Sequence, residues 1–380
     1  MQRINGLSVA GGALMAAAHF LCPPDPGIAR AAERVPVLDF LGIAEIPSGT
    51  RFEGTTIGGL SGAVAQPGRG SLLVVSDDRD GGADGTPRLY DITVDLADGS
   101  LDDGDLTVTA VHALRMKDGR TLDALLPDPE GIVIAPDGRL WISSERDTDG
   151  RPQIMAFEDF VMVGELTVPE GHMPGPGRGV RNNKGFESLT LAPDGTTLWA
   201  AHESALVQDG PDATLEAGTL ARVLRYSLHA DGRGRLEAEY FYPVEPIANA
   251  PVPAAGYADS GLVEMFALDD GTLLALERSF SFGASGGGFT VRLFHVDPST
   301  ATPIAVGAVG GGDAAAEPVA MTKTLVMDLR ETGATLYNLE AIADGPTLPD
   351  GRETLLIISD DNFGKFRAQA TQFLAFAIER

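Results

Sequence analysis

Acidic residues recur at two matched places in five similar segments of the chain. Each segment contains a short apolar run, a turn, a second apolar run and then an acidic residue; the segments span residues 59–78, 129–146, 186–204, 261–279 and 339–361. The matched residues are Ser61 with Asp77, Glu130 with Glu145, Glu187 with Glu203, Glu264 with Glu277, and Glu340 with Asp360. Nine of these ten side chains are carboxylates, which bind hard cations and perform acid–base chemistry.

These carboxylates predict a divalent-cation site if the fold brings them together. Many like charges in a confined space must take up protons, pair with cations or hold a metal ion. Oxygen ligands without Cys or clustered His favour Ca²⁺ or Mg²⁺ over Zn²⁺. We therefore expect Ca²⁺ or Mg²⁺, with ligands drawn from Asp77, Glu130, Glu145, Glu187, Glu203, Glu264, Glu277, Glu340 and Asp360.

Basic residues lie close to these acids in the sequence. Arg79, Arg146 and Arg278 each follow the second acid of a pair within two residues, and Lys184 precedes Glu187 by three. Such cations can hold a developing oxyanion. We predict Glu130, Glu187, Arg79, Lys184 and Arg278 as catalytic residues. Among the scattered histidines, His202 is the one expected near the site, because it precedes Glu203.

The apolar runs predict the elements that would position these side chains. Each run has five to seven residues rich in Val, Ile, Leu, Trp and Ala, and a turn joins the two runs, as in a β-hairpin. Pro136-Asp137-Gly138 and Pro193-Asp194-Gly195 are typical turn sequences. The segments start 57 to 78 residues apart, which suits a four-stranded propeller blade.

We predict an all-β fold: a single β-propeller with five four-stranded blades. Only one strand, residues 371–378, follows the fifth segment, so Val35–Ile46 is expected to complete the last blade and to leave no open sheet edge. The alternative is a sixth, degenerate blade within residues 205–260 or 297–325. Since the first strand of a blade starts at the face where the second ends, the five pairs should converge at one mouth of the channel.

Residues 1–31 have the pattern of a signal peptide. Arg3 supplies the positive charge, an apolar stretch runs from Leu7 to Leu21, and Ala29-Arg30-Ala31 offers a cleavage site. We expect a periplasmic or secreted domain of residues 32–380, with an uncleaved anchor or a lipoprotein signal at Cys22 as alternatives. Cleavage would remove the only cysteine and would exclude disulfides and thiol catalysis.

The charge of the chain limits its partners. The net charge is −26, and loss of Arg3, Asp25 and Arg30, together +1, would make it −27. This excess opposes binding to nucleic acid or to an anionic membrane. We expect a monomer that binds a small molecule, no nucleic acid and, after cleavage, no membrane.

Several motifs lie at the ends of the predicted strands. They are Gly59-Leu60-Ser61-Gly62, Ser76-Asp77-Asp78-Arg79, Asp128-Pro129-Glu130-Gly131-Ile132, Asn183-Lys184-Gly185-Phe186-Glu187-Ser188-Leu189, Asn338-Leu339-Glu340-Ala341-Ile342, Ser359-Asp360-Asp361-Asn362-Phe363 and Thr371-Gln372-Phe373-Leu374-Ala375-Phe376. Together they resemble the phytase-like family described as having "esterase-like activity of phytase", over residues 37–378. Ala341 departs from the family pattern, in which Gly usually follows the Glu.

The resemblance implies an exported, propeller-like hydrolase of a phosphoester or carboxylic ester. In this hypothesis the carboxylates hold Ca²⁺ while the nearby Arg and Lys side chains hold the oxyanion. The alternative is a non-catalytic periplasmic binding or scaffold propeller. There the same acids bind a cation, or accept backbone hydrogen bonds that lock one blade to the next.

Overall fold

Antiparallel strands form almost all of the regular structure in this computed structural model, which describes residues 35–78, 86–122, 127–304, 318–365 and 369–379. The predicted signal peptide, Cys22 and Arg79 lie outside the described residues. Five four-stranded sheets account for most of the strands. Within the described residues, no helix is long and apolar enough to cross a membrane.

Four of the blades are built from consecutive strands. The first contains β4 (Leu60–Ala65), β5 (Ser71–Ser76), β6 (Arg88–Val94) and β7 (Leu106–Ala113). The second contains β8 (Pro129–Ile134), β9 (Leu140–Ser144), β10 (Gln153–Glu158) and β11 (Val161–Glu165). The third contains β12 (Phe186–Leu191), β13 (Thr197–His202), β14 (Thr219–Leu228) and β15 (Gly234–Val244). The fourth contains β16 (Ala258–Ala267), β17 (Leu273–Ser281), β18 (Phe289–Asp297) and β19 (Thr322–Asp328).

The fifth blade joins the two ends of the described chain. It contains β20 (Asn338–Asp344), β21 (Glu353–Asp360), β22 (Thr371–Glu379) and, as its outer strand, β1 (Val37–Ile46). β1 pairs with β22 along its whole length, and the rings of Phe40 and Phe376 lie 5.3 Å apart across the pair. The predicted closure is therefore confirmed.

Short elements complete the described structure. β2 (Arg51–Phe52) and β3 (Thr55–Thr56) form a small hairpin before the first blade. Single 3₁₀ turns are η2 (Glu170–His172), η3 (Gly286–Gly288), η4 (Pro298–Thr300), η5 (Leu329–Thr332) and η6 (Asn362–Gly364). At the predicted turns, Gly138 and Gly195 adopt φ values of 86° and 68°, which glycine accepts without a Cβ clash.

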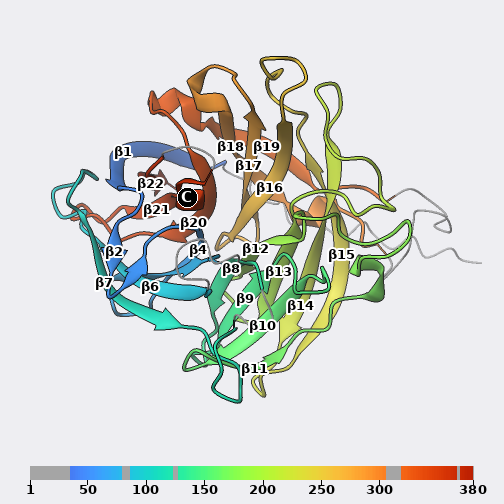
Figure 1. Cartoon of the computed structure of the whole chain (residues 1–380), viewed down its shortest axis with the longest axis horizontal. Coiled ribbons are helices and arrows are strands. Elements are labelled where there is room, and N and C mark those ends of the chain that lie inside the picture. Colours follow the sequence, from blue (N-terminus) through green and yellow to red (C-terminus); the bar gives the residue numbers. More distant parts are fainter. Residues whose placement is uncertain (1–34, 79–85, 123–126, 305–317, 366–368, 380) are drawn as a thin grey trace, which may run out of the picture. The chain divides into compact units, whose positions relative to one another are not determined.

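The first strands of the blades form a closed ring. β4 contacts β8, β8 contacts β12, β12 contacts β16, β16 contacts β20, and β20 returns to β4 (Figure 1). The five main apolar clusters each combine side chains from two neighbouring blades. The five-blade prediction is confirmed. The six-blade alternative is wrong, since residues 205–260 and the described part of 297–325 belong to the third and fourth blades and their connections.

Closure by β1 predicts a loss of stability when that strand is removed. A chain starting at Pro47 should unfold at a lower temperature than one starting at Ala32, and should self-associate, because the edge of β22 is exposed. Calorimetry and size-exclusion chromatography measure the two effects. Equal unfolding temperatures for the two chains would contradict the closure.

Candidate functional site: a carboxylate ring

A register shift between the first and second strands of every blade sets the geometry of the site. The residues at these shifts, called here the bulge positions, are Ser61, Glu130, Glu187, Val263 and Glu340. A bulge turns a side chain away from the regular alternation of the strand. The residues where the second strands reach the ring, called here the exit positions, are Asp77, Glu145, Glu203, Arg278 and Asp360. In every blade but the fourth, they lie at or just beyond the end of the sheet pairing.

The sequence fills these two sets mainly with acids. Of the ten positions, seven carry carboxylates, and Asp128 adds another opposite Glu145. Glycine makes room for them at two places. A Cβ on Gly59 would lie 1.9 Å from Asp77 Oδ1, and one on Gly261 would lie 2.3 Å from Glu203 Cγ.

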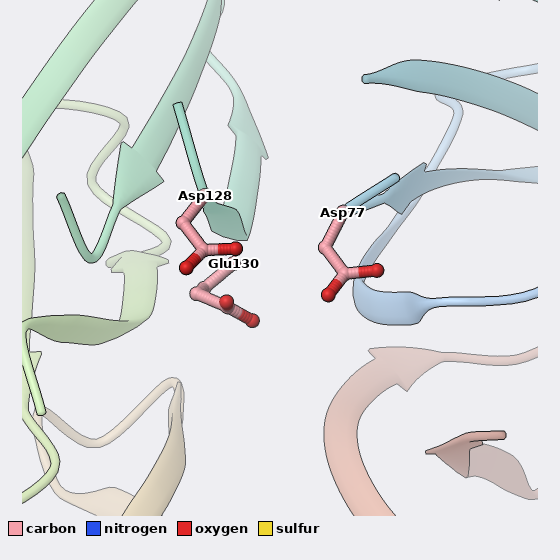
Figure 2. A group of neighbouring side chains, drawn as sticks. All are labelled: Asp77, Asp128 and Glu130. Atoms are coloured by element: carbon pink, nitrogen blue, oxygen red, sulfur yellow. The ribbon is translucent and has the colours of Figure 1, made fainter. Parts of the chain in front are cut away.

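Two clusters of carboxylates form between neighbouring blades. Asp77, from the first blade, and Asp128 and Glu130, from the second, have oxygens within 4.8 Å of one another and point into the same space (Figure 2). Glu145, Glu187 and Glu203 form the other cluster, between the second and third blades, within the same limit. The structure thus brings together acids that are up to 58 residues apart within one cluster.

Cations lie among these acids. Arg278 donates to Glu203 at 3.1 Å, to Asn338 at 2.7 Å and to Glu340, so it links the third, fourth and fifth blades. Lys184 donates to Glu203 at 3.1 Å and to Asp259 at 2.6 Å. Arg146 donates to Asp128 at 2.8 Å. The structure therefore places Lys184, Arg278, Glu130 and Glu187 in one region, while their catalytic role stays a prediction.

The fourth blade corrects one predicted pair. Glu264 is paired with Leu276, and Glu277 with Leu262, so the two acids do not face each other. Val263 and Arg278 occupy the bulge and exit positions instead. A shift of one residue along a strand moves a side chain to the other face. Glu264 and Glu277 each lie one residue from a ring position, so the prediction that they form a ring pair is wrong.

The two displaced acids have other partners. Glu264 Oε1 accepts from the Met265 N–H at 2.8 Å, and Glu264 also bonds with Ser188 and the Leu189 N–H of the third blade. Glu277 accepts from the Tyr242 hydroxyl at 2.6 Å and from Lys323. Glu264 thus links the third and fourth blades, which is the role that the non-catalytic alternative gives to these acids.

Burial and mutual repulsion favour the protonated forms of several of these carboxyls. Burial, followed by neighbouring acids, raises the pKa of Asp77, Glu130, Glu187 and Asp360 well above the ordinary range. Burial, with repulsion from Asp128 and Glu203, raises the pKa of Glu145 to about 7. A bound cation would oppose these shifts, because it favours the ionised forms.

The donor chemistry of both clusters fits a hard divalent cation. Each cluster offers three carboxylates, the ligand type that Ca²⁺ prefers. Asp77 Oδ1 is buried and has no hydrogen-bond partner among the described residues. An acceptor oxygen of this kind is costly to bury unpaired, and a cation would supply its missing partner.

A buried polar chain next to the ring was not predicted. His202 points away from the ring, stacks on Phe186 at 4.2 Å and bonds His172 at 2.8 Å. His172 bonds Glu239 at 3.0 Å, which accepts from Arg222 at 2.6 Å. His202 is fully buried, so it is not a solvated rim histidine. Asp128 was also missed as a ring member, although it directly precedes the Pro129-Glu130-Gly131 motif.

Similarity to a known family extends over most of the chain. Residues 55–363 match a family profile described as "Phytase-like: Esterase-like activity of phytase". An uncharacterised secreted protein of Arthroderma benhamiae is 31% identical over 109 residues, which cover 22% of this chain. The chain spans only 20% of that relative's length.

Solved structures with similar chains are distant. A periplasmic gluconolactonase of Pseudomonas aeruginosa is 14% identical, with a TM-score of 0.37, and the match covers 90% of this chain and 99% of that one. An endo-arabinase of Bacteroides thetaiotaomicron is 12% identical, with a TM-score of 0.44, and the match covers 88% of this chain and 97% of that one.

The lock at Glu264 predicts a contrast between two substitutions. Burial raises the pKa of Glu264 to about 8, so at pH 6 the side chain is protonated and Glu264→Gln should change the free energy of unfolding little. Glu264→Ala should cost about 1–3 kcal/mol, because buried donors lose their acceptor. Denaturant titration at pH 6 measures both, and an equal loss in the two variants would contradict the lock.

The raised pKa values also predict how stability depends on pH. The folded protein holds protons on ring carboxyls that the unfolded chain releases near pH 4.5. Without divalent cations, the free energy of unfolding should therefore fall from about pH 5 to pH 8, by on the order of a few kcal/mol.

Ca²⁺ should reverse this trend, because it binds the ionised carboxylates and competes with protons. Melting curves at pH 5 and pH 8, with chelator or with Ca²⁺, provide the measurement. The stabilisation by Ca²⁺ should be larger at pH 8, and equal shifts at the two pH values would count against a cation in the ring.

Proposed function

The chain belongs to the phytase-like family described as "Esterase-like activity of phytase", and from this premise we propose that it is an exported hydrolase of phosphoesters or carboxylic esters. The carboxylate ring is its active site, with Ca²⁺ as the cofactor. The observation that carries the proposal is the convergence of seven buried or half-buried carboxylates with Arg278 and Lys184 in one region.

Each group in the ring has a role that its position supports. Glu145, Glu187 and Glu203 would hold the cation, as would Asp77, Asp128 and Glu130. The bound cation supplies an activated water and neutralises the charge of the reacting group. With the cation held by Glu145, Glu187 and Glu203, Glu130 would take up the proton of the attacking water, because a nearby cation favours the ionised carboxylate that a general base requires.

The basic residues would bind the anionic part of the substrate. Arg278 already forms ion pairs with Glu203 and Glu340, and Lys184 forms one with Asp259. A phosphate or oxyanion that approaches them exchanges one negative partner for another, with little reorganisation. Arg79, which lies outside the described residues, is proposed to act in the same way.

A second candidate is a binding or scaffold propeller without catalysis. One acid, Glu264, supports this function, because it joins the third and fourth blades through hydrogen bonds and does not lie in the ring. In this case Ca²⁺ would raise the melting temperature while no ester or phosphoester is turned over.

Hydrolysis of a phosphomonoester and an aryl ester, with Ca²⁺ and with chelator, tests the proposed function. The chain should hydrolyse at least one of them in a chelator-sensitive manner. Glu187→Gln should lower kcat/KM by on the order of 100-fold, because it removes a charged ligand from the ring, while circular dichroism stays unchanged.

Glu216→Gln is the matched control, since Glu216 is an exposed loop residue outside both carboxylate clusters. It should keep full activity. A folded, Ca²⁺-saturated protein that turns over neither substrate would leave only the binding or scaffold function.

A further inference from the structure

In the fourth blade, the open end of the β16–β17 hairpin continues past the ring. Its ring residues, Gly261 and Arg278, are paired, yet the pairing runs on for three more residues to Ala258 and Ser281. In the first blade, by contrast, the pairing of the first two strands stops at Leu60 and Ser76, next to the ring acid Asp77. The hairpin therefore rises above one side of the ring.

One face of this hairpin carries aromatic rings. Alternate residues of a strand share a face, so Phe280 lies on the face of Arg278, and Phe282 follows directly after the end of β17. On the partner strand, Asp259 is paired with Phe280, and Tyr257 accepts a hydrogen bond from the Phe282 N–H. The rings of Tyr257 and Phe280 lie 6.2 Å apart, which places Tyr257 on the same side.

That face adjoins the ring on the side of the fifth blade, where Phe280 packs against the apolar cluster shared by the fourth and fifth blades. Arg278 reaches Glu203 on the third blade and Glu340 on the fifth, so its side chain points between the two neighbours of its own blade. Phe280 and Phe282 follow it at intervals of two residues. We call Tyr257, Phe280 and Phe282 the aromatic wall.

Two of the three residues of the aromatic wall are largely exposed, while Phe280 is half-buried. Tyr257 is 66% and Phe282 is 54% exposed, and the adjacent Val252 is 62% exposed. Val252 is joined to the wall by its N–H, which donates to the Phe282 carbonyl at 2.7 Å. Exposed large apolar side chains that cluster in this way mark a binding surface.

A continuous set of polar contacts connects the wall to the ring. The Tyr257 hydroxyl donates to Asp259 at 2.9 Å, Asp259 pairs with Lys184 at 2.6 Å, and Lys184 pairs with Glu203 at 3.1 Å. A molecule with its anionic end at Lys184 and Arg278 would thus meet aromatic side chains directly beyond that end.

We propose that the aromatic wall is a substrate subsite that binds an aryl group attached to the phosphate or ester. This deepens the proposed function and rests on it for the reaction, but not for binding. Offset or edge-to-face contacts with the rings of Tyr257 and Phe282 stabilise a flat apolar group. Alkyl phosphates and esters of similar charge would gain less.

Binding of two phosphonates tests the subsite without any turnover. Phenylphosphonate and methylphosphonate are titrated calorimetrically into the Ca²⁺-loaded chain. The phenyl compound should bind about five- to tenfold more tightly, and Phe282→Ala should remove most of that difference. Tyr257→Phe should keep it, because the ring and not the hydroxyl makes the contact.

Leu325→Ala is the control for loss of an exposed apolar side chain, since Leu325 is 48% exposed on the outer strand β19. It should leave the affinity difference unchanged. Equal binding of the two phosphonates, or binding of neither, would overturn the subsite. A wild-type dimer that Phe282→Ala converts into a monomer would also overturn it, because the wall would then be a protein interface.

Kinetics separate this proposal from the proposed function. If the chain hydrolyses phosphoesters, the ratio of kcat/KM for phenyl phosphate to that for an alkyl phosphate should fall about five- to tenfold in Phe282→Ala. A tighter phenylphosphonate complex without turnover would support the subsite and refute the hydrolase. Turnover with an unchanged ratio would refute the subsite alone.

Discussion

Repulsion among buried carboxylates is the constraint on which the site depends. The propeller brings the starts of the first strands and the ends of the second strands to one region, and this sequence places acids at most of those positions. Such a ring is stable only if protons or cations offset the charge. Arg278 meets part of that need, because it joins acids of the third and fifth blades from the one blade that carries no ring acid.

The fourth blade differs from the other four where it meets the ring. Val263 and Arg278 replace the acids there, and the same blade extends into the aromatic wall. The two acidic clusters lie instead between the first and second, and the second and third, blades. In the proposed function, cation binding, anion binding and apolar contact therefore belong to different sectors of one ring.

Much of the fold could be predicted from the sequence, because the repeat of apolar runs and turns is local. The runs around Pro136-Asp137-Gly138 predicted a hairpin, and the missing strand of the fifth segment predicted the role of residues 35–46. The site was only partly predictable. Glu264 and Glu277 sit one residue from the ring positions, and the position of a bulge is not visible in residue types alone.

Other parts of the site carried no sequence signal. His202 and His172 are 30 residues apart and meet only through the connection between the second and third blades. Phe282 directly follows β17, and only the β16–β17 pairing, which continues past Arg278 to Ser281, brings it beyond the ring. Long-range pairing, which no local pattern encodes, decides both cases.

Anomalous diffraction from crystals grown with Ca²⁺ or Mn²⁺ tests cation binding in the carboxylate ring most directly. For Ca²⁺ we expect a metal peak about 2.3–2.6 Å from carboxylate oxygens of Glu145, Glu187 and Glu203, or of Asp77, Asp128 and Glu130. A well-ordered ring without any metal peak, at cation concentrations that saturate the crystal, would contradict this expectation.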